Sequence, residues 1–252
     1  MFIERFRLDG KVALLTGSGR GIGLGMAKVF AEQGAAVAIQ DLDRDVAEAE
    51  AKAIRHAGGR AIAIGGDVSD LSVVKTFIPQ TVEQLGGLHI LVNNAGLQAD
   101  QHYAEQSDEK VEWQLRANMV AAMRLVQWAL PIFKQQHWGR VINVSSIQGR
   151  KGNPGNLPYG MSKAALNHMT LSLARELGQA GATINCIAPG WFDTLRNKTQ
   201  LTPEHRENAK KWIPAGRHGD DFDCAGYALL LASDAGLYIT GQTLVIDGGL
   251  TA

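Results

Sequence analysis

The stretch that decides the fold is Lys11–Gly23, which reads KVALLTGSGRGIG. It opens with a short apolar run of strand length and then turns through Gly17, Gly21 and Gly23. A helical pattern of apolar residues follows and stops at Gly34. The free N–H groups and positive dipole of a helix N-terminus attract phosphate, and glycine lets that phosphate approach the backbone closely. The stretch therefore predicts a strand, a phosphate-binding turn and a helix.

The rest of the chain repeats this alternation of apolar runs and helical patterns. Runs of strand length are found at 35–41, 60–68, 88–93, 141–145, 182–190 and 242–249. Helical patterns are found at 43–59, 71–85, 107–135, 159–178 and 222–232. Strands joined by helices of this length form βαβ units, which build a parallel sheet with helices on both faces. We therefore expect an α/β fold, a doubly wound parallel sheet of about seven strands.

No linker, composition break or internal repeat divides the chain, so residues 1–252 are expected to form one domain. The stretch that is hardest to assign is 191–214, which is polar and contains Pro203, two tryptophans and clustered charges. We interpret it as a partly helical excursion and a possible lid over a binding site.

Charge and cysteine content argue against several classes of protein. The 25 Lys and Arg residues balance 25 Asp and Glu residues, so nothing favours binding to nucleic acid or an anionic membrane. No apolar run reaches membrane-spanning length. Cys186 and Cys224 are isolated, and the seven histidines are scattered without metal-ligand spacing. We expect a cytoplasmic protein with no metal site and with neither nucleic acid nor a membrane as partner.

A second stretch, 141–166, carries the candidate chemistry. A β-branched run ends in Ser145 and Ser146, and a loop rich in Gly, Pro and Asn leads to a helix near Tyr159. Tyr159 and Lys163 are four residues apart and share one face of that helix, and the loop would let Ser146 face them. An ammonium beside a phenol favours phenolate and would lower the pKa of Tyr159 from its usual ~10. Taken alone, a Tyr and a Lys four residues apart more often mark a solvated helix face than a catalytic pair, and two serines after a strand more often belong to an ordinary loop.

Two charged residues near the glycine turn bear on the choice of dinucleotide. Asp41 ends the second predicted strand, where a carboxylate can accept hydrogen bonds from ribose hydroxyls and would repel a 2′-phosphate. Arg20, inside the turn, could instead bind a 2′-phosphate. Burying Asp41 against a phosphate would cost more than leaving Arg20 in solvent, so NAD is favoured over NADP. The alternative for Asp41 is an N-cap or turn residue before the next helix.

Polar turns also follow the third and fourth predicted strands, as Asp67-Val68 and Asn93-Asn94-Ala95-Gly96. In a doubly wound sheet, ligands lie outside the carboxyl ends of the strands, so these turns should line one crevice with the glycine turn. Ordinary turn chemistry would explain each turn alone, whereas their shared position favours a binding site.

Together these residues resemble the short-chain dehydrogenase/reductase family, in its subgroup of roughly 250 residues. The resemblance covers essentially the whole chain, and the residues that carry it are Thr16-Gly17-x-x-x-Gly21-x-Gly23, Asp67, Asn93-Asn94-Ala95-Gly96, Asn118, Ser146, Tyr159-x-x-x-Lys163, Pro189-Gly190 with Thr194, and Asp247-Gly248-Gly249. It implies a Rossmann-type sheet with strand order 3-2-1-4-5-6-7 and a homotetramer.

The resemblance also implies catalytic roles. Tyr159 would be the acid/base, Lys163 would hold the nicotinamide ribose, and Ser146 would orient the substrate oxygen. Asn118 would position a water in the proton relay beyond Lys163.

Further positions are implied to contact the cofactor. Thr194 would bind the nicotinamide carboxamide, Asp67 and Val68 would contact adenine, and Asn94 would steady the central strand. The full set of expected cofactor contacts is Gly17, Arg20, Gly21, Ile22, Gly23, Asp41, Asp67, Val68, Asn94, Ala95, Gly96, Tyr159, Lys163, Pro189, Gly190 and Thr194.

The leading hypothesis is an NAD-dependent oxidoreductase that acts on a secondary hydroxyl of a small polyol, sugar acid or related metabolite. The rivals are an NADPH-dependent reductase of a β-ketoacyl thioester or xenobiotic ketone, and a dinucleotide-binding protein without turnover. Residues expected to rim the substrate pocket are Gln98, Gln148, Arg150, Lys151, Asn156, Trp191 and Arg196. Arg150 and Lys151 could attract an acidic substrate, although solvation is the simpler interpretation.

Overall fold

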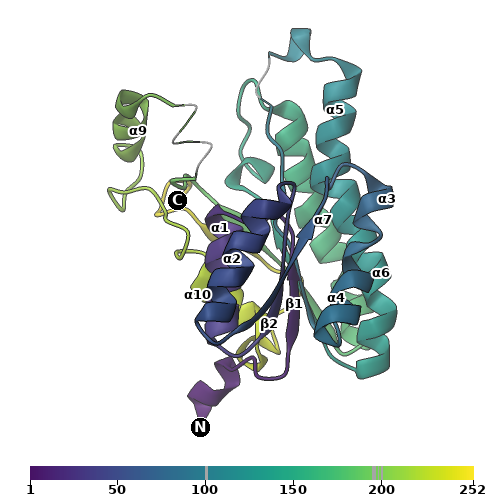
Figure 1. The fold of residues 1–252 in the computed structure, drawn as a ribbon. Coiled ribbons are helices and arrows are strands. Elements are labelled where there is room, and N and C mark those ends of the chain that lie inside the picture. The colour runs from purple at the N-terminus through teal and green to yellow at the C-terminus, as the bar shows by residue number, and fades with distance from the viewer. Residues whose placement is uncertain (100–101, 195–196, 198, 200) are drawn as a thin grey trace.

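The structure is a computed structural model that describes residues 1–99, 102–194, 197, 199 and 201–252. Within these residues seven parallel strands form one sheet in the order β3-β2-β1-β4-β5-β6-β7, which confirms the predicted order (Figure 1). The strands are β1 (Val12–Leu15), β2 (Ala36–Asp41), β3 (Arg60–Gly65), β4 (Ile90–Asn93), β5 (Gly139–Val144), β6 (Ala182–Pro189) and β7 (Thr243–Ile246).

The sheet reverses its winding direction beside β1. Ala13 pairs with Val37 of β2 on one side and with Ile90 of β4 on the other. Between these two neighbours the turns that leave β1 and β4 lie next to each other at the carboxyl ends of the strands. A crevice at this position is where doubly wound sheets bind their ligands.

Helices cover both faces of the sheet. Their bounds are α1 (Gly21–Glu32), α2 (Arg44–His56), α3 (Leu71–Val74), α4 (Phe77–Leu85), α5 (Asp108–Leu115), α6 (Ala121–Gln136), α7 (Leu157–Gln179), α9 (Pro203–Lys210) and α10 (Ala225–Ala232). One face of the sheet packs against α1, α2 and α10, and the other packs against α4, α6 and α7 (Figure 1). None of the helices in the described part of the chain is long and apolar enough to cross a membrane.

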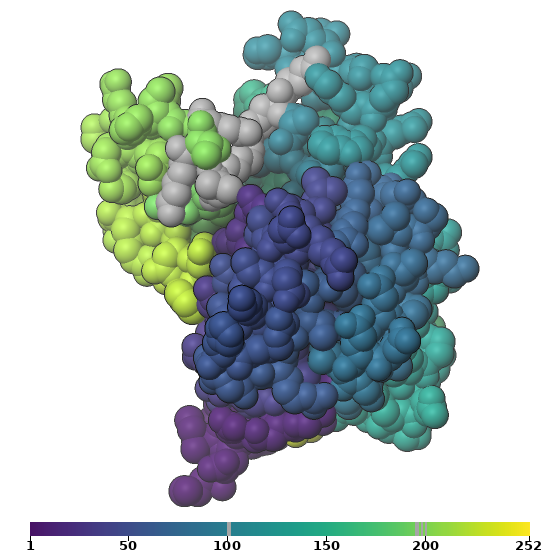
Figure 2. All heavy atoms as spheres, viewed as in Figure 1, coloured from purple at the N-terminus to yellow at the C-terminus, as the bar shows by residue number. Residues whose placement is uncertain are grey.

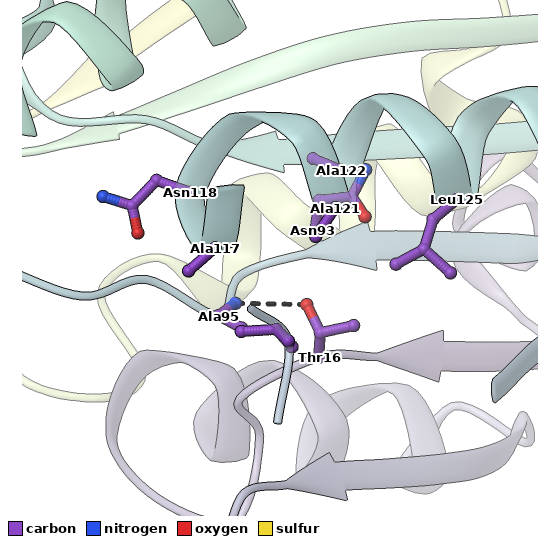
Figure 3. Close-up of a pocket in the computed structure, with 9 residues that line it drawn as sticks. Thr16, Asn93, Ala95, Ala117, Asn118, Ala121, Ala122 and Leu125 are labelled. Carbon is purple, nitrogen blue, oxygen red and sulfur yellow. Dashed lines mark hydrogen bonds between the residues drawn. The ribbon is translucent and has the colours of Figure 1, made fainter. Parts of the chain in front are cut away.

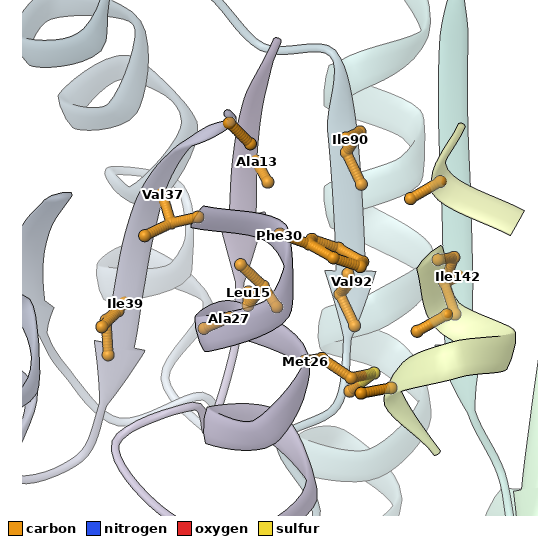
Figure 4. Close-up of a cluster of buried hydrophobic side chains, with 14 of the residues drawn as sticks. Ala13, Leu15, Met26, Ala27, Phe30, Val37, Ile39, Ile90, Val92 and Ile142 are labelled. Atoms are coloured by element: carbon orange, nitrogen blue, oxygen red, sulfur yellow. The ribbon is translucent and has the colours of Figure 1, made fainter. Parts of the chain in front are cut away.

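Strand alternation divides the core into two layers. In β1, Ala13 and Leu15 face the α1 layer, whereas Val12 and Leu14 face the opposite layer. Figure 4 shows Met26 and Phe30 of α1 pointing onto the strands of the first layer. Burying a side chain such as Phe30 contributes about 1.5–3 kcal/mol to the stability of the fold. Because α1 gains this energy only in one position on the sheet, the packing fixes where its N-terminus lies.

Two predicted helices are broken in the structure. The helix expected over 71–85 is divided into α3 and α4, and the helix expected over 107–135 contains a π-helical turn, Arg116–Val120, between α5 and α6. The π-turn holds Asn118, whose side chain bonds to the loop after β4. Apolar periodicity averages over such a one-residue insertion and therefore missed it.

The segments beyond the carboxyl ends of the strands stand over the predicted crevice. Helices α5 and α9 project at the same end of the molecule, opposite the N-terminus (Figures 1 and 2). Part of the 191–214 stretch is helical as predicted, in α9, and Phe192 forms a bridge with Gly219. A lid role for this stretch stays a prediction.

Candidate active site

A cavity of about 800 Å³ opens at the carboxyl ends of the strands. This volume lies within the range of pockets that bury a cofactor or substrate. All sixteen positions expected to contact the cofactor lie on its wall, and so does Ser146. Asn118 lies behind this wall instead, beside a smaller cavity. The structure therefore brings together, at one crevice, turns that are far apart in the sequence.

The glycine turn packs directly against the turn after β4. Gly17 has φ +59°, and a Cβ on it would lie 2.7 Å from the Ala95 Cα. Asn94 Nδ2 donates to the carbonyls of Thr16 at 2.9 Å and Gly17 at 2.7 Å. A Cβ on Gly23 would lie 2.5 Å from that same Asn94 nitrogen. The glycines are thus needed for close backbone packing as well as for turn geometry.

The N-terminus of α1 faces the cavity without a side-chain cap. Arg20 is the N-cap residue and makes no capping bond, and Gly21, Ile22 and Gly23 line the cavity. The first N–H groups of a helix need acceptors, and an anion supplies them. A glycine cradle joined to an uncapped helix N-terminus fits the pyrophosphate of a dinucleotide.

Asp41 is held in place by the same turn. Its carboxylate accepts from the backbone N–H groups of Gly19 and Asp43, each at 3.2 Å. The N-cap of α2 is Asp43, so the N-cap alternative for Asp41 is wrong, whereas its bond from Asp43 N two residues on confirms the turn alternative. Arg20 Nη2 lies 3.9 Å from Asp41 Oδ1, and the Arg20 side chain is 45% exposed. A pair 3.9 Å apart with one well-solvated partner is weak, so Arg20 can leave Asp41 at little cost.

Gln40 is a structural residue that sequence reasoning missed. Its Oε1 accepts from Gly17 N at 3.2 Å, and its Nε2 donates to Gly66 O at 2.8 Å. The side chain therefore joins the turns that follow β1 and β3. A buried amide at the end of an otherwise apolar strand was the available signal.

Other residues expected to contact the cofactor line the main cavity and also have local structural roles. Asp67 Oδ1 accepts from Ser69 N at 2.7 Å, as the turn alternative allows. Thr194 Oγ1 accepts from Asn197 N at 3.4 Å. Gly190 packs so closely against Asp247 that a Cβ would overlap it, which explains the glycine after β6.

The loop after β5 brings a serine, the tyrosine and the lysine together. Ser145 Oγ donates to the Lys163 carbonyl at 2.9 Å, so this serine is structural. Ser146 Oγ accepts from Gln148 N at 3.1 Å and lies on the cavity wall. Lys163 Nζ lies 5.5 Å from the centroid of the Tyr159 ring. The predicted Ser146, Tyr159 and Lys163 set therefore shares one site.

Lys163 is a buried cation at the back of the cavity. Its Nζ donates to Val144 O at 2.8 Å, and the residue is 2% exposed. Burial lowers the pKa of Lys163 to about 8, and a smaller electrostatic effect of Cys186 acts in the opposite direction. Lys163 remains mostly protonated at neutral pH. Its charge is poorly screened there and acts strongly on the neighbouring phenol.

Asn118 braces the site from behind. Its Oδ1 accepts from Leu97 N at 2.7 Å, and its Nδ2 donates to Leu97 O at 2.8 Å and Ser162 Oγ at 3.1 Å. Figure 3 shows Asn118 beside a second cavity with Asn93, Ala95 and Thr16, where Ala95 N donates to Thr16 Oγ1 at 3.1 Å. This second cavity has a volume of about 10 Å³, roughly the space one water needs.

The substrate end of the main cavity is polar and has few charges. Gln98, Gln148, Asn156 and Trp191 line it as predicted. Arg150 and Lys151 are exposed and lie off the wall, so they do not rim the pocket, and the simpler interpretation that they are solvated is confirmed. Both side chains extend from the loop into water. Arg196 lies outside the described residues.

Trp191 is held against His218 at the cavity wall. The two rings stack with centroids 5.7 Å apart and an interplanar angle of 15°. Burial lowers the pKa of His218, which keeps its ring neutral at physiological pH. A neutral ring packs face to face with the indole without bringing a charge to the wall.

Comparison with known proteins identifies the family. The family model described as enoyl-(acyl carrier protein) reductase matches residues 17–251. A 3-oxoacyl-[acyl-carrier-protein] reductase, FabG, of Staphylococcus aureus is 38% identical over 241 residues, 95% of this chain and 98% of that protein. The chain belongs to the short-chain dehydrogenase/reductase family, as the sequence motifs predicted. It is an oxidoreductase of alcohol or ketone groups from a family that uses NAD(P).

Two solved structures show the range of chemistry on this fold. A gluconate 5-dehydrogenase from Burkholderia cenocepacia in complex with NADP and tartrate is 34% identical, with a TM-score of 0.92 over 100% of this chain and 99% of that one. A 7α-hydroxysteroid dehydrogenase complexed with NADH and 7-oxo glycochenodeoxycholic acid is 31% identical, with a TM-score of 0.94 over 98% and 96%.

Proposed function

We propose that this protein transfers a hydride between NAD and a secondary alcohol or ketone, with Tyr159 as the acid/base. The observation that carries the proposal is the convergence of Ser146, Tyr159 and the buried Lys163 on the cavity that also holds the glycine turn. The proposed substrate is a small polyol, sugar acid or related metabolite. A structural neighbour named as a gluconate 5-dehydrogenase supports this class.

The side chains divide the proton chemistry among them. Ser146 Oγ already accepts a hydrogen bond from Gln148 N, which leaves its own O–H to donate to the substrate oxygen. In oxidation, Tyr159 takes the proton of the substrate hydroxyl, and in reduction it returns one. The bound nicotinamide would accept or supply the hydride. Lys163 favours the deprotonated phenol through its charge. Asn118 ties the loop after β4 to Ser162, which precedes Lys163 in α7, and would position a relay water.

The preference for NAD rests on Asp41. Its carboxylate is fixed by two backbone N–H groups at the end of β2, where a ribose can use it and a 2′-phosphate is repelled. The ratio of kcat/KM for NAD to that for NADP measures this preference. A ratio above one is expected.

A second candidate is an NADPH-dependent reductase of β-ketoacyl thioesters. The 38% identical reductase from Staphylococcus aureus and the half-exposed Arg20 support it. Acetoacetyl thioester with NADPH would then be turned over faster than any polyol with NAD. The proposal expects the reverse order.

The test of the acid/base assignment is Tyr159→Phe, which removes the proton carrier and little else. Turnover should fall roughly 10²–10⁴-fold, the usual contribution of a positioned acid or base, while NADH fluorescence still reports binding. Tyr238→Phe is the matched control because Tyr238 is fully exposed and away from the cavity. Equal activity in the two variants would refute the assignment. NADH binding without turnover in the wild type would favour a non-catalytic dinucleotide-binding protein.

A further inference from the structure

A buried serine lies between the tyrosine and the lysine of the candidate site. Ser162 directly precedes Lys163 in α7 and is fully buried. Its Oγ donates to the Tyr159 carbonyl at 2.7 Å and accepts from Asn118 Nδ2 at 3.1 Å. A helical serine often donates to a carbonyl one turn back, so the first bond alone would be a local structural feature. The bond from Asn118 differs, because it joins α7 to the π-helical turn between α5 and α6.

The hydroxyl of Ser162 completes the hydrogen bonding of Asn118. The Asn118 Oδ1 accepts from Leu97 N, which fixes the orientation of the amide, and Nδ2 donates to Leu97 O. A side-chain amide has two N–H donors, and the second of them is the one that Ser162 Oγ accepts. Asn118 is 1% exposed and Ser162 is 0% exposed. Without the serine hydroxyl, a buried N–H would lose its acceptor, and Asn118 would lose its bond to α7.

Asn118 in turn holds the loop after β4 against the lysine. Leu97, whose backbone N–H and carbonyl are both bonded to Asn118, follows Gly96 in this loop. A Cβ on Gly96 would lie 3.1 Å from Lys163 Nζ and 3.7 Å from Asn118 Oδ1. The loop backbone is thus packed against the ammonium group, and Gly96, Leu97 and Lys163 all line the main cavity. A shift of the loop would open space beside Nζ on the cavity side.

Water in that space would weaken the action of the lysine on the phenol. A poorly screened charge acts strongly on its neighbours, and solvent reduces that action. Lys163 Nζ lies 5.5 Å from the centroid of the Tyr159 ring, so its effect depends on how well water is kept away. Two packed steps therefore connect the serine to the acid/base. The first is the bond from Ser162 to Asn118, and the second is the loop that Asn118 holds.

We infer that Ser162 is a positioning residue for the proposed acid/base chemistry. Through Asn118 it holds the loop after β4 against Lys163, which keeps the lysine charge effective on the phenol of Tyr159. The inference rests on the proposed function and adds a residue to it. Ser162 lies off the wall of the main cavity, so it acts through its neighbours and not by touching the substrate.

The effect of Ser162→Ala on alcohol oxidation tests this role. The assay uses NAD with whichever of 2-butanol, 2,3-butanediol, xylitol and D-gluconate the wild type oxidises fastest. The kcat should fall roughly 10- to 100-fold, as expected when a reacting group moves by up to about 1 Å. The acidic limb of the kcat/KM profile should move to higher pH, because phenolate forms less readily beside a hydrated ammonium. The Kd for NADH, measured by fluorescence, should change less than kcat.

The other titratable groups leave the acidic limb to the phenol. Burial lowers the pKa of Lys163 to about 8, so it is mostly protonated over this limb. Cys186 of β6 also acts on Lys163, and burial raises the pKa of its thiol to about 11, so it stays neutral in the assay. The shift in the pH profile therefore measures how strongly the lysine favours phenolate.

Thr170→Val is the matched control, because it removes a bond of the same kind from the same helix. Thr170 Oγ1 accepts from Asn143 Nδ2 at 2.9 Å, and the residue is fully buried. Each variant leaves one buried amide N–H without its hydroxyl acceptor, so each should melt roughly 2–12 °C below the wild type. Only Ser162→Ala should move the pH profile.

A double-mutant cycle with Asn118→Leu tests the route through Asn118. This change keeps the size of the side chain and removes its amide. In the Asn118→Leu background, Ser162→Ala should alter kcat less than about twofold, because the bond that it removes is already lost.

The outcomes separate this inference from the proposed function. A pH profile of Ser162→Ala that superimposes on that of the wild type, an equal shift in Thr170→Val, or the same change in kcat with and without the Asn118 amide would each overturn the inference alone. No turnover of any of the four alcohols by the wild type, with NADH still bound, would overturn the proposed function and this inference with it.

Discussion

Gly17→Ala would test whether the glycine turn packs on the turn after β4 as tightly as the structure shows. Gly17 has φ +59°, a conformation that costs a residue with a Cβ about 1–2 kcal/mol. The new Cβ would also lie 2.7 Å from the Ala95 Cα, a backbone atom that cannot rotate away. Overpacking of this kind adds about 1–3 kcal/mol, so the total destabilisation should be about 2–5 kcal/mol.

Gly10→Ala is the matched control, because Gly10 has φ +73° and nothing within 4 Å of its added Cβ. It should show the conformational cost alone, about 1–2 kcal/mol. Thermal unfolding followed by circular dichroism compares the two variants. At about 2–4 °C per kcal/mol, Gly17→Ala should melt roughly 2–12 °C below Gly10→Ala. It should also lose NADH affinity, which the control keeps. Equal melting temperatures would refute the close packing of the two turns.

Three further changes have outcomes fixed by the structure. Asp41→Ala removes the carboxylate at the end of β2, so the NAD to NADP ratio of kcat/KM should fall at least about tenfold; an unchanged ratio would mean that another group sets the preference. Burial, and then the charge of Lys11, lower the pKa of His89 below its ordinary 6.5, and its Nδ1 accepts from Val12 N at 3.1 Å. The neutral ring therefore stabilises the fold fully above about pH 6.5 and less as pH falls through the lowered pKa. The melting temperature should drop on acidification more in the wild type than in His89→Asn, and parallel curves would contradict this. Cys186 and Cys224 are fully buried, and burial raises their pKa values to about 11 and about 12. Neither thiol should react with Ellman's reagent at pH 8 until denaturant is added, and one fast thiol in the native protein would be inconsistent with the packing.

Most of the fold could be predicted because local signals agree with one another. The glycine turn after β1, the alternation of strands and helices, and the polar turns after β3 and β4 all follow from short stretches of sequence. The π-turn at Arg116–Val120 was missed because it alters helix register without Pro or Gly. The break between α3 and α4 differs, because it lies just before Pro79 in the first turn of α4 and a proline cannot donate to the carbonyl four residues earlier, so the sequence did carry a signal there.

The positions of site residues were predictable where motifs have fixed spacing, and less predictable where tertiary contacts determine the direction of a side chain. Ser146, Tyr159 and Lys163 share the cavity as expected. Arg150 lies in the loop between Ser146 and Tyr159, yet its side chain points into solvent. The direction of a loop side chain depends on packing that the sequence does not reveal. The absence of a capping bond from Asn156 was equally hard to predict, since N-cap asparagines usually cap their helix.

Hydride transfer with NADH already bound is the most direct test of Tyr159 as the acid/base. A single turnover of the ketone substrate, followed by loss of NADH absorbance, measures the chemical step apart from cofactor binding. In Tyr159→Phe the rate should fall roughly 10²–10⁴-fold while the Kd for NADH stays within about twofold. A single-turnover rate in the variant equal to that of the wild type would contradict the account.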